Sequence, residues 1–188
     1  LSGIDPTTLN SAEAFVYWVN FYNALTVEVI LAEYPVKSIR NIFSGFRPGP
    51  WQRKITSVNG VEITLDHIEH GILRPFFGDN RVHYAVNCAS IGCPNLLARA
   101  WRAEDLDETL DDAARRYVNH PRGFRVENGR VIASSIYNWF QVDFGGDEAG
   151  VIDHLKTYAD DNTLKTLEGV TKINRFEYDW NLNDSAKE

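Results

Sequence analysis

The sequence of this chain predicts an α+β fold: one compact domain over residues 1–188, mainly helical, with a small antiparallel sheet and two hairpins. Segments with apolar residues at helical spacing outnumber segments that alternate between apolar and polar residues. The expected strands come in pairs joined by tight turns and do not alternate with helices in a β-α-β rhythm. A chain of 188 residues is long enough to bury a sizeable core as one domain.

The first and longest expected helix spans residues 11–33, where apolar residues recur at helical spacing. Asn10 or Ser11 can cap its start, because a short polar side chain accepts a hydrogen bond from the first helical turn. Pro35 ends it, because proline disfavours a helical conformation in the residue before it. A loop rich in glycine and proline is expected over residues 43–51.

Two hairpins are expected from Asn-Gly pairs, which favour the type I′ turn between antiparallel strands. They pair residues 53–58 with 61–64 around Asn59-Gly60, and residues 124–127 with 131–133 around Asn128-Gly129. The other expected elements are helices at 65–73, 105–119 and 150–160, a strand at 81–87, a helix or extended segment at 136–144, and an irregular aromatic end at 178–183. Thr64 or Asp66 can cap the helix at 65–73, and Pro75 stops it.

Charge and hydropathy exclude several classes of partner. The formal net charge is -7, whereas binding to nucleic acid or to anionic membranes needs a basic surface, so we expect neither as a partner. The longest apolar run, 14–32, is interrupted by Asn20, Asn23 and Glu28, which predicts a buried helix and no membrane insertion. The chain begins at Leu1 and contains no Met, which suggests a processed or trimmed start; the compartment stays open, periplasm and secretion included.

Both cysteines lie close to the expected strand at 81–87. Cys88 follows the strand directly, and the small residues after it, such as Ala89 and Ser90, would let backbone N–H groups approach a substrate. Cys88 therefore has the surroundings of a nucleophilic thiol, although free cysteines are also among the most buried core residues. Cys93 precedes a proline, and three roles are open for it: a resolving thiol, a disulfide partner of Cys88, or a packed side chain.

His70 is the candidate general base for Cys88, because strand alternation would place His83 on the opposite face. On the helix that carries His70, Asp66 lies four residues before it and can orient its imidazole. Glu69 is the second carboxylate within reach. An Asp-x-x-Glu pair at a helix start also forms a capping box, so both acids have a structural interpretation as well.

Asn20 and Asn23 are two amides inside an aromatic helix, three residues apart and therefore on one face. Buried amides must be hydrogen-bonded, so two interpretations are open. They either orient a histidine or hold an oxyanion in the site, or they tie a loop to the helix. The remaining histidines, His67, His120 and His154, are expected at the surface.

A metal site finds little support in the sequence. The side chains available to zinc are Cys88, Cys93, His83 and His70. Their C-x4-C spacing lies outside the usual short zinc-knuckle range, and no second cysteine pair exists. The sequence also lacks a phosphate-binding glycine loop and a Gly-x-Ser-x-Gly elbow. No metal and no cofactor are therefore expected.

Six segments together resemble one family: WVNFYNALT (18–26), YPVKSI (34–39), GPW (49–51), LDHIEHGILR (65–74), HYAVNCASIGCP (83–94) and YDWNLN (178–183). They are similar to the domain of unknown function 547, a family found in bacteria and, joined to coiled-coil segments, in plants. The resemblance covers essentially the whole chain and points to Asn20, Asn23, Glu69, His70 and Cys88 as motif positions. It also implies a distant likeness to papain-like cysteine hydrolases.

The leading hypothesis is a cysteine-dependent hydrolase or acyl-transfer enzyme that acts on peptide or amide bonds, with a peptide or protein as substrate or partner. Cys88 would attack the carbonyl, His70 would take its proton, and a carboxylate would orient the histidine. Asn20 or N–H groups near Ala89 would hold the oxyanion. The expected catalytic residues are Cys88, His70, Glu69 and Asn20, and the expected binding residues are Asn23, Asp66, Ser90 and Trp51.

Two other hypotheses stay open. In the first, the chain is a non-catalytic protein-interaction domain whose buried network of Asn, Glu and His side chains fixes the fold. In the second, Cys88 and Cys93 form a thiol redox site, which would place the two sulfur atoms within bonding reach.

Overall fold

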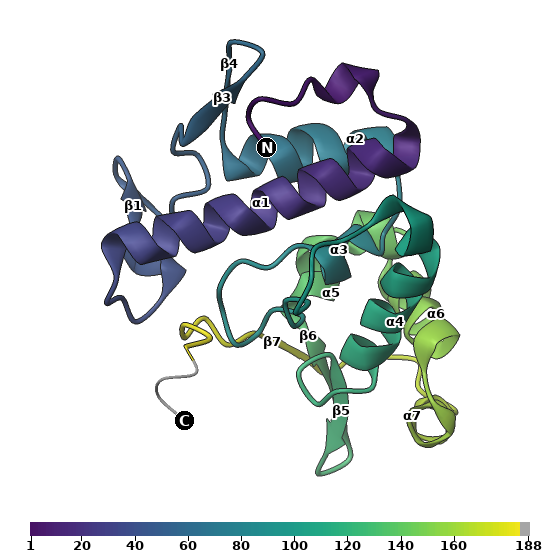
Figure 1. Cartoon of the computed structure of the whole chain (residues 1–188). Helices are drawn as coiled ribbons and strands as arrows, with labels where there is room; N and C mark the ends of the chain where they lie inside the picture. The colour runs from purple at the N-terminus through teal and green to yellow at the C-terminus, as the bar shows by residue number, and fades with distance from the viewer. Residues whose placement is uncertain (185–188) are drawn as a thin grey trace.

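The computed structural model describes residues 1–184 and confirms the α+β class (Figure 1). Its helices are α1 (Ser11–Glu33), α2 (Arg74–Phe77), α3 (Val82–Ala85), α4 (Leu106–Val118), α5 (Ser135–Trp139), α6 (Glu148–Tyr158) and α7 (Asp161–Leu167). Its strands are β1 (Phe43–Ser44), β2 (Arg47–Pro48), β3 (Thr56–Val58), β4 (Val61–Ile63), β5 (Phe124–Glu127), β6 (Arg130–Ser134) and β7 (Arg175–Glu177). Short 3-10 turns (Pro6–Thr8, Ile39–Asn41, Ala103–Asp105, Gln141–Phe144) and one π-helical segment (His67–Leu73) complete it.

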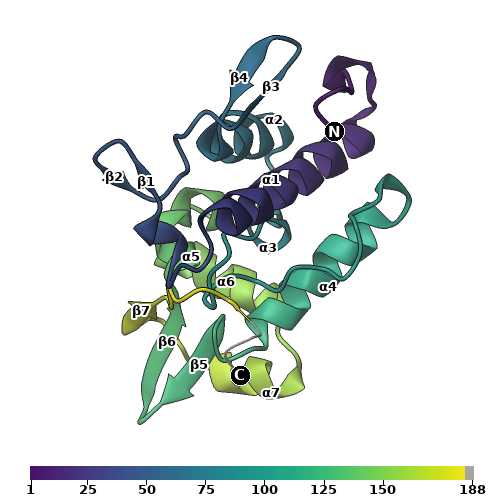
Figure 2. The same ribbon diagram turned by 60° about the vertical axis from the view of Figure 1, so that its left-hand side comes forward.

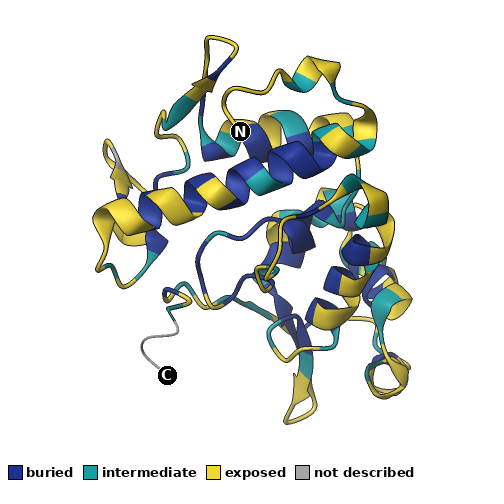
Figure 3. Ribbon diagram, in the orientation of Figure 1, coloured by how far each residue is buried: buried dark blue, intermediate teal, exposed yellow. Residues whose placement is uncertain are grey.

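α1 is the central helix, and its bounds are those expected from the sequence. Asn10 caps its start through a reciprocal pair of hydrogen bonds with Glu13, which satisfies two otherwise unpaired N–H groups. The helix is buried along its middle and exposed toward its C-terminal end (Figure 3). By length and composition α1 could cross a membrane, but most of its apolar window is buried within the fold, as in the core helix of a globular domain.

The helix that carries His70 begins as expected but does not end as expected. Thr64 accepts a hydrogen bond from the N–H of His67 and caps it, whereas Asp66 makes no side-chain cap bond, so the capping-box interpretation is wrong. Pro75 does not stop the helix, because the π-helical segment His67–Leu73 runs directly into α2. The missing N–H of Pro75 falls where the hydrogen-bond register changes from π to α, which lets the chain continue.

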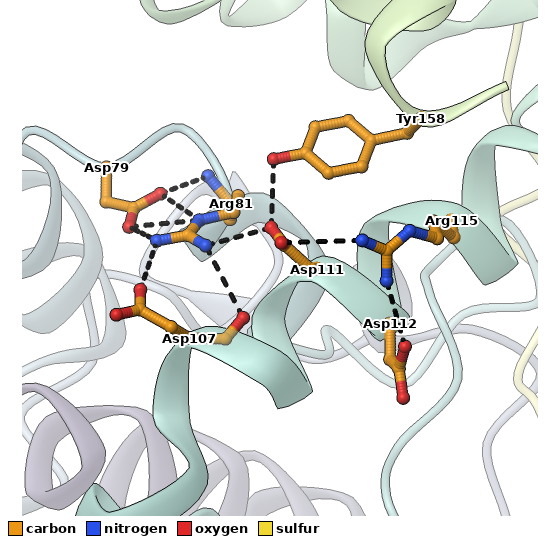
Figure 4. Close-up of polar contacts among 7 residues, drawn as sticks. All are labelled: Asp79, Arg81, Asp107, Asp111, Asp112, Arg115 and Tyr158. Atoms are coloured by element: carbon orange, nitrogen blue, oxygen red, sulfur yellow. Dashed lines mark hydrogen bonds and ion pairs between the residues drawn. The ribbon is translucent and has the colours of Figure 1, made fainter.

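The strand expected at 81–87 is wrong: Val82–Ala85 is a helical turn, α3, and only the chain after it is extended. The turn begins because the Asp79 carboxylate accepts a hydrogen bond from the Arg81 N–H at 2.9 Å. The Arg81 guanidinium also pairs with Asp79, Asp107 and Asp111, the last two on α4 (Figure 4). This anchoring to α4 outweighs the β propensity of the apolar run.

Both Asn-Gly hairpins are confirmed. Asn59 and Gly60 have φ of +50° and +76°, and the Asn128-Gly129 turn has φ of +51° and +72°, the left-handed values that a type I′ turn requires. The second hairpin, β5–β6, gains β7 as a parallel neighbour, so this sheet is mixed and not purely antiparallel. The glycine- and proline-rich loop contains one further small hairpin, β1–β2.

The segment at 136–144, left open between helix and extended chain, is helical: α5 and a 3-10 turn. The end at 178–183 is irregular and held by aromatic rings, as expected, with Trp139 stacked on Trp180 at 5.4 Å. It also hydrogen-bonds residues 88–93, the loop that carries both thiols (the cysteine loop). Ile91 N–H donates to Asn181 O, and Gly92 N–H donates to Asp179 O, both at 2.8 Å. This contact sets the position of the loop that carries both thiols.

In both views α1 crosses above α3, with the β5–β6 hairpin at the far end of the molecule (Figures 1 and 2). His67 and His120 are exposed as expected, but His154 is buried and its Nε2 lies 2.7 Å from the Tyr84 hydroxyl. The surface position expected for His154 is therefore wrong, because the sequence around it is polar while the face of α6 that carries it packs inward.

Candidate active site

A cavity of about 260 Å³ opens between α1, the His67–Leu73 segment, the cysteine loop, α5 and the C-terminal segment. Aromatic rings form most of its wall, and its lining also includes two carboxylates, two imidazoles, two thiols and two tyrosines, Tyr22 and Tyr178. Five of the expected site residues line it: Cys88, His70, Glu69, Asp66 and Trp51. A mostly apolar cavity with a few convergent polar groups is where a small protein usually binds or transforms a ligand.

Two thiols and two hydroxyls meet at one side of this cavity. Cys88 Sγ lies 2.8 Å from Cys93 Sγ, 3.1 Å from Ser90 Oγ and 3.1 Å from the Tyr178 hydroxyl. Cys93 Sγ lies 3.0 Å from the same tyrosine hydroxyl and accepts a hydrogen bond from the Cys88 N–H at 3.0 Å. Both cysteines are free, and Cys93 is the more deeply buried of the two.

The hydrogen bonds decide which sulfur carries the negative charge. Burial raises the pKa of Cys93, but donors from Cys88, Tyr178 and Ser90 outweigh burial and lower this pKa to about 7. The hydrogen bond to Cys93, followed by burial, raises the pKa of Cys88 well above its ordinary value. Burial and the neighbouring sulfurs also raise the pKa of Tyr178, so its hydroxyl keeps its proton and can donate. Cys93 is therefore the sulfur that loses its proton first as the pH rises through neutrality, and Cys88 keeps its proton.

Asn87 shapes the loop that brings the sulfurs together, and sequence reasoning missed it. Its Oδ1 accepts from the Ala89 N–H at 2.7 Å, and its Nδ2 donates to Pro94 O at 2.7 Å. Ala89 has φ of +58°, a left-handed conformation that costs an alanine on the order of 1–2 kcal/mol. The side-chain clamp compensates for this cost, and the turn that follows brings Cys93 back to Cys88.

Glu69 and His70 share the cavity with Cys88 but do not bond to it. Glu69 is buried, and its Oε1 lies 3.9 Å from His70 Nδ1, whereas the His70 side chain is 40% exposed. The His70 ring also lies 3.3 Å from an Arg74 nitrogen. Within residues 1–184, the polar side chains at hydrogen-bond distance from Cys88 Sγ are Ser90, Cys93 and Tyr178, and none of these is a histidine.

His83 is a second imidazole in the same cavity, and the argument that excluded it is wrong. Strand alternation does not apply, because α3 is a helical turn. His83 Nε2 lies 2.7 Å from Asp143 Oδ2, and Arg74 Nε donates to the same oxygen at 2.6 Å. The ring stacks on Phe140 at 4.3 Å. Burial raises the pKa of Asp143, but His83 and Arg74 outweigh burial and hold this pKa far below its ordinary value.

Comparison with known protein families gives a match for this chain. The chain matches the family described as "Protein of unknown function, DUF547" over residues 6–118, which is more than half of its 188 residues. The chain belongs to this family. No curated protein and no solved structure matches it.

The residues that match DUF547 supply one part of the cavity lining, and residues outside the match supply the rest. Both cysteines, Glu69, His70 and His83 lie within residues 6–118. The carboxylate of Asp143, the Tyr178 hydroxyl and the wall formed by Trp139, Phe140 and Trp180 come from beyond that range. The C-terminal third of this DUF547 protein thus completes a cavity whose thiols and imidazoles come from the matched segment.

The amides of Asn20 and Asn23 on α1 hydrogen-bond backbone groups, which agrees with the interpretation that they tie a loop to the helix. Asn20 exchanges hydrogen bonds with the N–H and O of Trp101 at 2.9 and 3.0 Å. Asn23 donates to Ala85 O at 2.9 Å and accepts from the Asn87 N–H at 2.8 Å. Neither side chain lines the cavity, so neither is placed to hold an oxyanion there. Within the described residues, no group of three or more His, Cys, Asp or Glu side chains could hold a metal ion.

Proposed function

We propose that this DUF547 protein is a cysteine-dependent hydrolase or acyl-transfer enzyme that acts on peptide or amide bonds. One observation carries the proposal: Cys88 lies in the wall of an aromatic cavity that also contains the Glu69–His70 pair and the His83–Asp143 pair. Nucleophilic catalysis by a thiol needs a proton acceptor and an acid for the leaving group beside the sulfur, and this cavity supplies both kinds of group.

In the proposed reaction Cys88 Sγ attacks the carbonyl carbon. Its proton passes to the Cys93 thiolate, which is 2.8 Å away and has a pKa of about 7. His70, with Glu69 beside it, then protonates the leaving nitrogen as the carbon–nitrogen bond breaks. Water then attacks the thioester and gives one proton to His70, which restores its protonated form. The carbon–sulfur bond breaks, and Cys88 leaves and takes back its proton from Cys93. If an amine attacks instead, the reaction is acyl transfer.

The oxyanion requires donors other than those expected from the sequence. The Ala89 N–H donates to Asn87 Oδ1, and the Cys88 N–H donates to Cys93 Sγ, so both backbone donors are engaged. The Tyr178 hydroxyl lines the cavity and lies 3.1 Å from Cys88 Sγ, and it keeps its proton because burial and the neighbouring sulfurs raise its pKa. We assign oxyanion stabilisation to this hydroxyl.

The test uses p-nitrophenyl acetate as an activated acyl donor and intact mass spectrometry as the readout. The wild type is expected to release p-nitrophenol in a burst and to carry one acetyl group on Cys88. Cys88→Ser should lose the burst, and His70→Asn should slow the decay of the acyl-enzyme while leaving its formation largely intact. Equal burst and acetylation in Cys88→Ser and the wild type would overturn the proposal.

Because His83 with Asp143 is a second imidazole–carboxylate pair in the cavity, His83→Asn is the matched variant for His70→Asn. If His83→Asn slows decay of the acyl-enzyme and His70→Asn does not, the roles of the two histidines are exchanged and the His70 assignment is rejected. The comparison is made at equal folded fraction, because His83 is buried and His70 is not.

The alternative is a non-catalytic interaction domain, and one observation favours it. Asn23 is a buried amide of the kind that this alternative invokes, and it and the half-buried Asn20 give their hydrogen bonds to backbone groups. An interaction domain would also present a broad exposed aromatic patch, whereas Trp51, Trp139 and Trp180 line a cavity. This alternative predicts no acyl-enzyme in the experiment above.

A further inference from the structure

The two cysteine sulfurs are already in contact within the folded loop. Cys88 Sγ and Cys93 Sγ lie 2.8 Å apart, while both residues are free thiols. Two thiols that meet in this way can be joined with only a small movement of either side chain, since paired cysteines need their Cβ atoms close and facing each other.

The backbone of the loop holds this arrangement without help from a covalent bond. Asn87 binds both ends of the loop, through the Ala89 N–H and Pro94 O. The Cys93 N–H closes the turn onto Ser90 O at 3.0 Å. The loop-closure entropy that usually opposes disulfide formation has therefore been lost already on folding.

The surroundings also give the two thiols different tasks. Both cysteines line the cavity, but Cys88 is only partly buried whereas Cys93 is buried, so Cys88 is the sulfur that an external reagent meets first. Cys93 is buried behind it, and hydrogen bonds from Cys88, Ser90 and Tyr178 lower its pKa to about 7. A buried thiolate directly behind an accessible thiol is the arrangement that resolves a mixed disulfide.

We propose that Cys88 and Cys93 form a reversible disulfide by exchange with a small organic disulfide that enters the cavity. Cys88 attacks one sulfur of the reagent, its sulfur–sulfur bond breaks, and the first thiol leaves with the proton of Cys88. The Cys93 thiolate then attacks Cys88 Sγ, the mixed disulfide breaks, and the second thiol leaves with a proton from solvent. The protein loses two hydrogen atoms, and the reagent is reduced to two thiols.

This redox site does not depend on the acyl chemistry proposed above. If both hold, oxidation removes the nucleophile, and the disulfide inhibits the enzyme reversibly. If Cys88 is not a nucleophile toward acyl donors, the thiol pair still exchanges with disulfides. The two proposals can therefore fail separately.

The experiment equilibrates the full chain with glutathione buffers of increasing oxidised fraction. Samples are quenched in acid, unfolded, and labelled with a maleimide, so that burial does not hide Cys93 from the label. The wild type is expected to pass from two labelled cysteines to none, with an intact mass lower by two hydrogens and no bound glutathione. A reductant should restore both labels.

Two matched variants identify the route. Cys93→Ser should stop at a stable Cys88–glutathione adduct, because the resolving thiol is gone. Cys88→Ser should take up glutathione much more slowly, because Cys93 is buried. The proposal is overturned if the wild type keeps both labels in the most oxidising buffer, retains bound glutathione, or forms disulfide-linked dimers. Because p-nitrophenyl acetate acylation is measured separately on reduced protein, failure of one result does not imply failure of the other.

Discussion

Removing the hydroxyl of Tyr178 should raise the pKa of the Cys93 thiol. That hydroxyl lies 3.0 Å from Cys93 Sγ, 3.1 Å from Cys88 Sγ and 2.8 Å from Ser90 Oγ, so it is the centre of the polar cluster. A hydrogen bond to a charged acceptor contributes about 1.5–3 kcal/mol, and one pKa unit corresponds to about 1.4 kcal/mol. Tyr178→Phe should therefore move the thiolate pKa from about 7 to roughly 8–9.

The assay is the ultraviolet absorbance of thiolate followed across pH, on reduced protein. The matched control is Tyr17→Phe, which removes a hydroxyl that donates to Leu1 O, away from the cavity. The control should titrate with the wild type, while Tyr178→Phe titrates at higher pH and exchanges more slowly with glutathione at neutral pH. If all three proteins titrate together, the tyrosine hydroxyl does not stabilise the thiolate and the charge assignment is wrong.

Three further predictions concern stability. Burial lowers the pKa of His154 to about 4, below the roughly 6.5 of an unfolded histidine, so the unfolded state binds the proton first as pH falls. Urea unfolding should show about 2.5 kcal/mol lost between pH 7 and 4.5, and His154→Gln should abolish most of that difference. Asn23→Leu leaves the Ala85 carbonyl and the Asn87 N–H unpaired, so it should lower the free energy of unfolding by about 2–4 kcal/mol in the same assay. An unchanged free energy of unfolding would show that the two hydrogen bonds of Asn23 do not stabilise the fold. Arg81→Met should destabilise by about 1–3 kcal/mol, with the loss reduced at high salt, because three carboxylates lose their shared partner.

The parts of the fold predicted correctly are those whose signals are local. The bounds of α1 follow from helical spacing and a cap at Asn10, and both Asn-Gly hairpins follow from the φ that their turns require. The irregular end at 178–183 follows from its density of aromatic residues. In each case the residues that decide the conformation lie within a few positions of one another.

The errors arise where distant residues decide the conformation. The run at 82–86 has strand-like composition, but Arg81 is bound by two carboxylates of α4, 26 and 30 residues away, and the segment becomes helical. The same error excluded His83 from the site. Tyr178 and Asp143 were also missed, because no spacing rule relates a residue to partners 60 or 90 positions away.

Two interpretations of Asn23 are open from the sequence, as part of the site or as a tie between loop and helix, and the structure joins them. Asn23 on α1 accepts the Asn87 N–H, and the Asn87 side chain in turn clamps the loop at Ala89 and Pro94. That loop sets the distance between Cys88 and Cys93. A buried amide network that only fixed the fold would not have to end at two thiols in a cavity wall. Asn23 is therefore best understood as a positioning residue, and Asn23→Leu should alter thiol exchange with glutathione in the protein that remains folded.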